Sequence, residues 1–358
     1  MITVIYPYRN RELERVRRSL DSLKNQTDTN FKTILVDYGS DETTTRALQE
    51  LIKQYPFVDY QYLFTGDQPW SRSIALNYAI RRADTEYCFM ADIDMIFAPD
   101  FIAFANLNSR PDQGLYFPVG FLSEEESLSE KLYDHYKIKF SSTSEAAGMS
   151  LFPTEKLHQV RGYDQFFHFW GSEDNDIHNR LKKVGCTIRF CDDKIRMVHQ
   201  WHPNYRQTET RKLNRELQLS GVVELNQQHM WFNRNQELTV VNFENWGIVI
   251  SETQYKILST LPVQKVTNKK SEIEHLLTAR FTKLNEGTAI SVRIEEDPFH
   301  NSIKYRLKKI LGKKVPQYYT LKEINDLILR QVVTMYGHLP YTYKISENCK
   351  SIEFKITK

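Results

Sequence analysis

Apolar runs that alternate with stretches of helical periodicity fill the first hundred residues. The strand-like runs lie at residues 3–6, 31–36, 59–63 and 87–91, and the helical stretches at 12–25, 43–54 and 72–82. Strands that alternate with helices of this length are typical of a parallel α/β sheet, which binds ligands at the carboxyl ends of its strands. We therefore expect a Rossmann-like α/β fold with a mainly parallel central sheet.

Polar residues follow three of these strand-like runs. They lie at residues 7–11, 37–41 and 92–94. A parallel sheet would gather all three segments at one edge, where a ligand could bind. The alternative is that they are ordinary loops, which are polar in most proteins. One such segment alone would not distinguish the two interpretations.

Composition excludes several classes of protein. Lys and Arg number 48 against 45 Asp and Glu, so the net charge of +3 does not indicate nucleic-acid binding. The four cysteines show no CxxC spacing, which favours reduced thiols over a disulfide framework or a metal finger. No signal peptide and no run of about 18 apolar residues is found, so we expect a cytoplasmic protein.

Asp92 and Asp94 come directly after the apolar run at 87–91. Alternate residues of a strand point to the same side, so the two carboxylates would face one ligand. Such a pair of hard oxygen ligands suits Mg²⁺ or Mn²⁺ bridging a diphosphate. The motif is short, and a second copy occurs at residues 174–176, so chance occurrence remains an alternative.

Residues 169–177 place aromatic side chains and a glycine directly before three acids, at the start of a helix predicted over 174–184. We expect Ser172 to cap this helix. The helix dipole alone explains the acids, which are favoured in a first turn. It does not explain the aromatic run at 166–170. An aromatic ring beside carboxylates is typical of a sugar site, where C–H groups stack on the ring and the acids accept hydroxyls.

His199 and His202 follow a strand-like segment near residue 197. A single histidine is more often structural than a metal ligand. Two histidines in this position favour a metal site that also contains Asp94, and an imidazole ligand suits Mn²⁺ better than Mg²⁺.

Four motifs occur in the order found in the β-1,4-galactosyltransferases and related chondroitin-type polymerases. Residues 7–11 (Pro-Tyr-Arg-Asn-Arg) resemble the family's Pro-Phe-Arg-Asn-Arg, and residues 170–181 resemble its Trp-Gly-Gly-Glu-Asp-Asp-Asp-Ile-Tyr-Asn-Arg-Leu. Residues 196–199 resemble the segment that supplies the family's metal-ligating histidine, and Asp92 and Asp94 complete the set. The resemblance spans about the first 205 residues. It implies a GT-A fold and an inverting glycosyl transfer.

The resemblance also implies roles for individual residues. Asp94 and His199 would hold Mn²⁺ or Mg²⁺, and Asp174 would act as the general base. The residues that would bind the nucleotide sugar are Pro7, Tyr8, Arg9, Arg11, Asp37, Arg72, Asp92 and Ile93. Trp170, Gly171 and Glu173 would contact the acceptor, and Asp176 would be structural. The spacing between Met197 and His199 is one residue shorter than in the family, so whether Met197 or His202 contacts the metal stays open.

These motifs predict that residues 1–235 form a GT-A catalytic domain. It would transfer a sugar of the Gal, GalNAc, GlcNAc or GlcA type from a UDP-sugar to a saccharide or lipid-linked saccharide, in bacterial surface polysaccharide synthesis. Two alternatives stay open: a retaining GT-A transferase, and a non-catalytic carbohydrate-binding protein of the same fold. The sequence identifies neither the sugar, the acceptor nor the oligomeric state.

Residues 236–358 differ in character and are predicted to form a smaller α+β domain. Strand-like runs are expected at 238–241, 247–251 and 289–292, and helices at 271–284 and 321–333. The basic, amphipathic stretch 305–314 would suit peripheral contact with an anionic membrane. An ordinary solvated helix face is the alternative. Two further helices are expected before this region, over 124–139 as a mobile flap and over 209–219.

Overall fold

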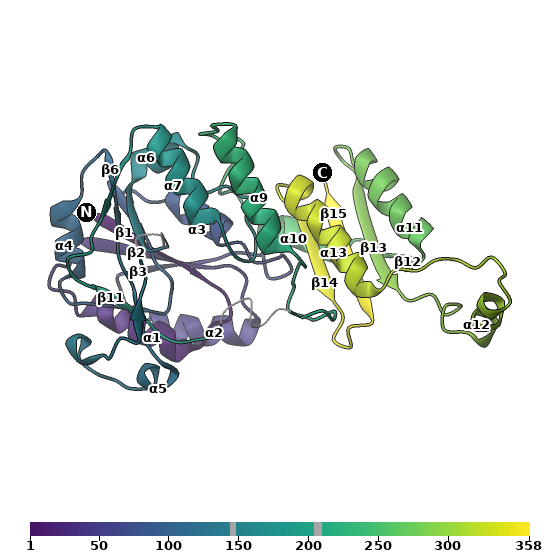
Figure 1. The fold of residues 1–358 in the computed structure, drawn as a ribbon, viewed down its shortest axis with the longest axis horizontal. Coiled ribbons are helices and arrows are strands. Elements are labelled where there is room, and N and C mark those ends of the chain that lie inside the picture. Colours follow the sequence, from purple (N-terminus) through teal and green to yellow (C-terminus); the bar gives the residue numbers. More distant parts are fainter. Residues whose placement is uncertain (144–147, 204–209) are drawn as a thin grey trace. The chain divides into compact units, whose positions relative to one another are not determined.

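The computed structural model describes residues 1–143, 148–203 and 210–358 (Figure 1). The chain forms two compact units that interleave along the sequence. The N-terminal unit comprises Met1–Gly66, Ser71–Asn204 and Val223–Ile248, and the C-terminal unit comprises Asp67–Trp70, Tyr205–Val222 and Val249–Lys358. The domain boundary expected after residue 235 remains a proposal.

A seven-stranded sheet forms the centre of the N-terminal unit, in the order β10-β6-β9-β4-β1-β2-β3. Its strands are β1 (Ile2–Tyr8), β2 (Phe31–Asp37), β3 (Val58–Tyr62), β4 (Tyr87–Met90), β6 (Gln113–Tyr116), β9 (Ser150–Pro153) and β10 (Thr187–Phe190). Strands β3, β2, β1 and β4 run parallel, whereas β9 is antiparallel to both β4 and β6. The predicted α/β fold with a mainly parallel sheet is therefore confirmed.

Burial on both faces explains the apolar character of the central strands. All seven residues of β1 are buried, as expected for a parallel strand that is covered on each side. Helix α1 (Leu13–Lys24) contributes to this core through Val16, Leu20 and Leu23, which recur at helical spacing on its buried face. The sheet is thus a rigid base, and its carboxyl edge carries the loops described below.

The helices of the N-terminal unit differ in how they begin, and α2 and α3 start at polar side-chain caps, whereas α4, α6 and α7 have none. The Asp41 side chain accepts a hydrogen bond from the Thr44 amide at the start of α2, and Ser71 accepts one from the Ile74 amide at the start of α3. These helices are α2 (Glu42–Ile52), α3 (Arg72–Ile80), α4 (Phe101–Asn108), α5 (Glu124–Ser127), α6 (Thr154–Gln159), α7 (Glu173–Lys183) and α9 (Val222–Asn235).

A second, smaller sheet brings distant segments together. Its order is β5-β11-β7-β8, with β5 (Met95–Phe97), β7 (Gly120–Phe121), β8 (Phe140–Ser141) and β11 (Met197–His199). Strand β11 is antiparallel to β5, and His199 pairs with Met95. The pairing places the end of β11 next to the loop that contains Asp92 and Asp94.

Two helices expected from the sequence are not found. Residues 124–139 form only the short helix α5, a 3₁₀ turn at Tyr133–His135 and irregular backbone before β8. No residue of α5 is buried, so no packed apolar face extends the helix beyond its first turn. Of the helix expected over 209–219, residue 209 lies outside the described residues, and residues 210–219 contain no helix.

The C-terminal unit is an α+β structure around a four-stranded sheet in the order β12-β13-β15-β14. Its strands are β12 (Gln264–Thr267), β13 (Ala289–Glu295), β14 (Tyr341–Ile345) and β15 (Ser351–Thr357). Its helices are α10 (Glu252–Thr260), α11 (Lys270–His275), α12 (Ile303–Ile310) and α13 (Leu321–Gln331), and π-helical turns at Leu276–Arg280 and Val332–Tyr336 extend α11 and α13.

The prediction of strands at 238–241 and 247–251 is wrong. Neither segment is extended in a sheet. Glu237 and Gly247 have positive φ angles of 54° and 68°, which turn the chain at the start of each run and prevent a regular strand. Of their apolar side chains, Ile250 is buried from a loop, whereas Val240 and Ile248 are exposed.

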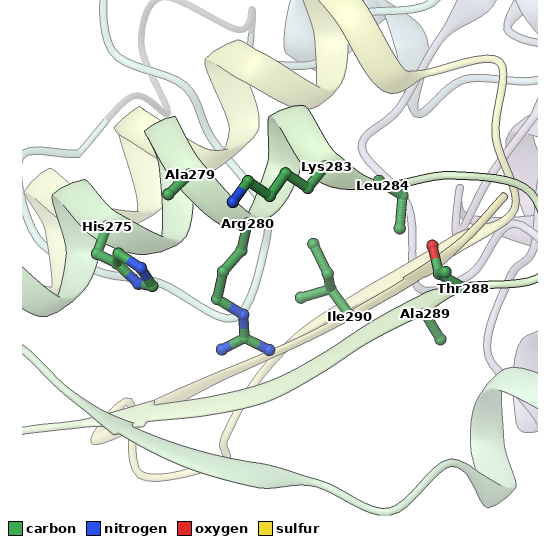
Figure 2. A pocket seen from close by; sticks show the side chains of 8 residues that line it. All are labelled: His275, Ala279, Arg280, Lys283, Leu284, Thr288, Ala289 and Ile290. Carbon is green, nitrogen blue, oxygen red and sulfur yellow. The ribbon is translucent and has the colours of Figure 1, made fainter.

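The C-terminal unit contains a hollow of about 290 Å³ (Figure 2). The residues that line it are His275, Ala279, Arg280, Lys283, Leu284, Thr288, Ala289 and Ile290. None of them is among the site residues predicted from the sequence, so the hollow does not bear on the predicted site.

Two expectations from composition can be compared with the structure. The four cysteines are free thiols, and Cys88, Cys186 and Cys191 are buried, as expected. Among the described residues, none of the helices combines the length and the apolar character that crossing a bilayer requires.

Gly39 supports a close approach between the turns that follow β2 and β3. Its φ angle is +78°, and a Cβ atom there would lie 2.6 Å from the Cα atom of Gly66. We expect Gly39→Ala to lower the free energy of unfolding by more than about 3 kcal/mol, because strain and overlap add. Gly185→Ala is the matched control, since φ is +81° but no atom lies within 4 Å. Urea unfolding should show a loss of only about 1–2 kcal/mol for the control, and equal losses would contradict the account.

Candidate active site

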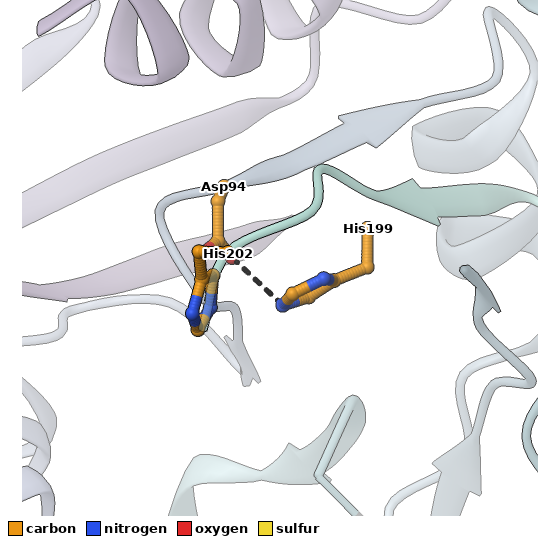
Figure 3. A group of neighbouring side chains, drawn as sticks. All are labelled: Asp94, His199 and His202. Atoms are coloured by element: carbon orange, nitrogen blue, oxygen red, sulfur yellow. Dashed lines mark ion pairs between the residues drawn. The ribbon is translucent and has the colours of Figure 1, made fainter. Parts of the chain in front are cut away.

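Asp94, His199 and His202 form a compact cluster at the carboxyl edge of the main sheet (Figure 3). Asp94 lies in the loop between β4 and β5, His199 ends β11, and His202 follows three residues later. The Nε2 atom of His199 lies 3.4 Å from Oδ1 of Asp94, and the Nε2 atom of His202 lies 3.1 Å from Oδ2. Both imidazole rings therefore face one carboxylate.

Backbone pairing fixes this arrangement. The Gln200 amide donates to the carbonyl oxygen of Asp94 at 3.1 Å, and the Leu122 amide donates to that of His199 at 3.1 Å. Together with the pairing of β5 and β11, these bonds hold residues from three parts of the chain in register. The cluster is thus a product of the smaller sheet.

The cluster has the chemistry of a divalent metal site. Oδ1 of Asp94 is buried and accepts no hydrogen bond among the described residues, which is costly unless a cation or another donor compensates. The candidate ligand atoms lie within 4.8 Å of one another. One carboxylate and two imidazoles suit Mn²⁺ better than Mg²⁺, which prefers oxygen ligands. The residues present therefore fit a bound transition-metal ion.

The charges within the cluster are coupled. Burial alone would raise the pKa of Asp94, but the facing His199 and His202 lower it below its ordinary value. Asp94 in turn raises the pKa of His202 through their hydrogen bond. The predicted ligands Asp94 and His199 are thus brought together, and His202, whose role the sequence left open, joins them. Met197, whose role the sequence also left open, is fully buried in the hydrophobic core.

Arg72 connects the loop beside this cluster to the start of α7. Its Nε atom donates to Oδ1 of Asp92 at 3.1 Å and its Nη1 atom to Oδ1 of Asp174 at 2.9 Å. Its Nη2 atom donates to the carbonyl oxygen of Gly148 at 3.3 Å. Burial would lower the pKa of Arg72, but Asp174 and Asp92 raise it. The guanidinium therefore stays charged and fixes the Asp174 carboxylate in place.

The turn before α7 is strained. Phe169, Gly171 and Ser172 all have positive φ angles, of 64°, 99° and 75°. Left-handed backbone at non-glycine residues often marks a functional site. Ser172 occupies the N-cap position but accepts no cap hydrogen bond, so the expected capping role is wrong. A side-chain cap requires extended backbone at that residue.

Asn226 of α9 holds this turn from outside. Its side-chain amide donates to the carbonyl oxygens of His168 at 3.0 Å and Trp170 at 3.1 Å. The Trp170 side chain remains 44% exposed, an unusual state for a large aromatic ring. Nothing in the sequence near Asn226 signalled this supporting role.

The acids at the start of α7 have different environments. Burial, followed by the charge of Asp174, raises the pKa of Glu173 to about 7. Burial also raises the pKa of Asp174, although Arg72 opposes the shift. Asp176 is buried, and it accepts from Nε of Arg180 at 2.7 Å and from Asn233 at 2.9 Å. Arg72 thus holds Asp174 and also binds Asp92. Asp176, in contrast, has a structural role, because its hydrogen bonds fix it in the packing around α7.

The residues predicted to bind the nucleotide lie at the same sheet edge. The Asn10 amide donates to the Ser40 hydroxyl at 2.9 Å, and the Asp41 amide to the Asn10 side chain at 3.0 Å. The loops after β1 and β2 are therefore joined. Arg9 donates to the carbonyl oxygens of Thr65 and Gly66, at 2.6 and 2.8 Å.

Four other predicted nucleotide contacts are less accessible. Pro7, Tyr8, Asp37 and Ile93 are all buried, and the Tyr8 hydroxyl donates to the carbonyl oxygen of Arg11 at 2.8 Å. Burial raises the pKa of Asp37, against bonds from Ser40, Tyr60 and Thr45. The structure thus places Asp37 as a buried acceptor that orders its loop, and the Arg9 guanidinium lies over the ring of the neighbouring Tyr38.

Two protein-family models match the chain. Residues 3–105 match the model described as glycosyl transferase family 2, and residues 129–203 match the model described as N-terminal domain of galactosyltransferase. The first match contains the segments 7–11 and 92–94, and the second contains 170–181 and both histidines. The predicted resemblance to GT-A glycosyltransferases, and with it the enzyme class, is confirmed.

Curated relatives are distant, and each matches this chain over only part of its length. Chondroitin sulfate synthase 3 of Mus musculus is 24% identical over 164 residues, which cover 44% of this chain and 18% of that protein. Beta-1,4-galactosyltransferase 5 of Homo sapiens is 26% identical over 133 residues, covering 37% and 31%. The chain thus matches less than a third of the length of either relative.

Solved structures give weak matches. The structure of GalNAc-T7 with UDP, GalNAc and Mn²⁺ has 16% identity and a TM-score of 0.45 over 57% of this chain and 43% of that one. S. aureus TarS 1–349 has 13% identity and a TM-score of 0.47 over 98% and 95%. These scores are too low to support an argument, so the fold assignment depends on the sheet order and the family models.

We expect His199→Ala and His202→Ala each to weaken Mn²⁺ binding at least about ten-fold, because each removes one nitrogen donor from the cluster. Isothermal titration of Mn²⁺ in the presence of UDP measures this without turnover. The control is His135→Ala, since His135 is exposed and outside the cluster. An unchanged titration for either cluster variant would remove that residue from the ligand set.

Proposed function

We propose that the chain transfers a sugar from a UDP-sugar to a saccharide or lipid-linked saccharide, with inversion at the anomeric carbon and with a divalent metal ion. One observation carries this proposal. Arg72 joins Asp92, two residues from the metal ligand Asp94, to Asp174 at the turn that presents Trp170. The Arg72 side chain therefore connects the candidate donor-sugar site at Asp92 with the candidate base Asp174 and the candidate acceptor site at Trp170.

On the donor side, Asp94, His199 and His202 would hold Mn²⁺ or, less suitably, Mg²⁺. The bound ion would neutralise the charge that develops on the diphosphate leaving group. Arg9 and Arg11 on the loop after β1 supply further positive charge at this edge. Asp92, which is 40% exposed, remains accessible to a ribose hydroxyl.

Asp174 is the proposed general base. Its carboxylate would accept the proton of the acceptor hydroxyl while that oxygen bonds to the anomeric carbon and the bond to the UDP oxygen breaks. A single in-line displacement of this kind inverts the configuration. Burial raises the pKa of Asp174 towards the range in which a carboxylate is an effective base, and Arg72 keeps it ionised and oriented.

The exposed ring of Trp170 would stack on the acceptor sugar, and Glu173 would bind its hydroxyls. A pKa of about 7 means that Glu173 can donate as well as accept hydrogen bonds near neutral pH. We further propose a cytoplasmic role in bacterial surface polysaccharide synthesis, which the resemblance to glycan-building transferases supports.

We expect Asp174→Asn to lower transfer by about 10²–10⁴-fold, the usual contribution of a general base, while UDP affinity changes less than about two-fold. Purified protein would first be screened for Mn²⁺-dependent hydrolysis of UDP-Gal, UDP-GalNAc, UDP-GlcNAc and UDP-GlcA, and the active donor then used with saccharide acceptors. Asp192→Asn is the control, because Asp192 is exposed and outside the site.

Wild-type turnover in Asp174→Asn would show that the base is another residue. Proton NMR of the new linkage gives an independent result, since retained anomeric configuration would identify a retaining transferase. Saccharide binding without transfer or hydrolysis of any donor would instead indicate a carbohydrate-binding protein.

A further inference from the structure

Helix α12 exposes its apolar side chains. None of its residues is buried. Ile303 is 75% exposed, Leu307 54%, Ile310 80% and the following Leu311 67%. Scattered exposed apolar residues are common, but four within nine positions form a continuous patch that costs free energy in water.

The apolar side chains share one face of the helix. At about 100° per residue, positions 303, 307, 310 and 311 fall within an arc of roughly 100°. Lys304 and Arg306 border this arc on its two sides. A stripe of large aliphatic residues with basic residues along its borders is the pattern of a helix that lies in a membrane interface.

The charge around the helix has one sign. From residue 298 to residue 320 the chain has no Asp or Glu, and it has six basic residues: Lys304, Arg306, Lys308, Lys309, Lys313 and Lys314. No ion pair involving these six is found within the described ranges, although Lys308 lies over the ring of Phe299. Such a segment complements an anionic surface.

An aromatic cluster fixes the opposite face. Tyr305 packs against Phe299 and His300, and the Tyr318 ring stacks on His300 with centroids 4.1 Å apart. The Tyr318 hydroxyl donates to Asp297 at 3.0 Å, and the Asp297 amide donates to Asn268 at the end of β12. The anchored face is the one that bears Tyr305, so the aliphatic stripe points away from the anchor.

This arrangement excludes the ordinary solvated helix that the sequence also allowed. Such a helix buries its apolar side chains and exposes its charged side chains to water. Helix α12 exposes its apolar and its charged side chains alike. Its eight residues are also too few for a helix to be stable by propensity alone. Ser302, which caps it, and Gly312, which ends it with a φ angle of +67°, set its limits without burying it.

We infer that α12 docks on the surface of an anionic lipid bilayer, with Ile303, Leu307 and Ile310 inserted among the acyl chains and the six basic residues at the headgroups. Two contributions to membrane binding add. Burial of the apolar side chains favours insertion, and the basic side chains are attracted to anionic headgroups. This inference does not depend on sugar transfer. If both hold, the surface would bring the enzyme to the lipid-linked form of its acceptor.

Vesicle co-sedimentation of the full chain tests the inference. We expect binding to vesicles with 70% phosphatidylcholine and 30% phosphatidylglycerol, and binding at least about ten-fold weaker to pure phosphatidylcholine, because each basic residue at an anionic surface contributes about a five-fold factor. The triple variant Ile303→Gln, Leu307→Gln, Ile310→Gln should bind the anionic vesicles at least about ten-fold more weakly.

A matched triple variant, Leu107→Gln, Ile248→Gln, Met335→Gln, changes equally exposed apolar residues elsewhere and should bind like the wild type. Thermal unfolding of both triple variants should match the wild type, since none of the six residues is buried. Absence of wild-type binding, or equal binding by the α12 variant, would overturn the inference. So would a change from dimer to monomer in the α12 variant by light scattering, because that would identify a second copy as the occupant. The assay contains no donor sugar, so its outcome is separate from that of the transfer assay.

Discussion

The guanidinium of Arg72 is the interaction on which the proposed site depends. It is 12% exposed and lies between the carboxylates of Asp92 and Asp174. A cation in this position lets two acids that would repel each other lie close together. It also ties the candidate base to the loop that carries the candidate metal ligand Asp94. Burial, followed by the charge of Asp174, raises the pKa of Glu173, and Arg72 offsets only part of this shift.

Most of the N-terminal unit could be predicted from the sequence, because the apolar patterns of its single strands and helices agree with the parallel sheet that they form together. Strand β1 is mostly apolar and is buried throughout, and the polar segments at 7–11, 37–41 and 92–94 follow parallel strands and so share one edge. The prediction of Asp94 and His199 as neighbours depended on the family resemblance, because 105 residues separate them and only the pairing of β5 with β11 brings them together. The sequence offered both histidines for a metal site with Asp94 but left open whether His202 is a ligand, and the structure places it three residues after the end of β11, beside Asp94.

The wrong predictions of helices and strands concern segments whose sequence pattern suits a helix or a strand but most of whose apolar side chains are not buried against the rest of the protein. Residues 124–139 are rich in charge and form only α5 and a 3₁₀ turn. The runs at 238–241 and 247–251 start at residues with positive φ angles and form no strand. Ser172 failed as a cap for a related reason: the turn that presents Trp170 needs left-handed backbone, and this requirement overrides the local preference for capping. The supporting contact from Asn226 spans more than fifty residues and has no local signature.

The central claim is that a divalent ion binds between Asp94, His199 and His202 and contacts the diphosphate of the donor. Crystals soaked with Mn²⁺ and UDP, measured at the manganese absorption edge, test it most directly. The account predicts one anomalous peak bounded by the Asp94 carboxylate and the Nε2 atoms of both histidines, with the UDP diphosphate against it. A manganese peak remote from these three side chains, or UDP bound away from this edge of the sheet, would contradict the account.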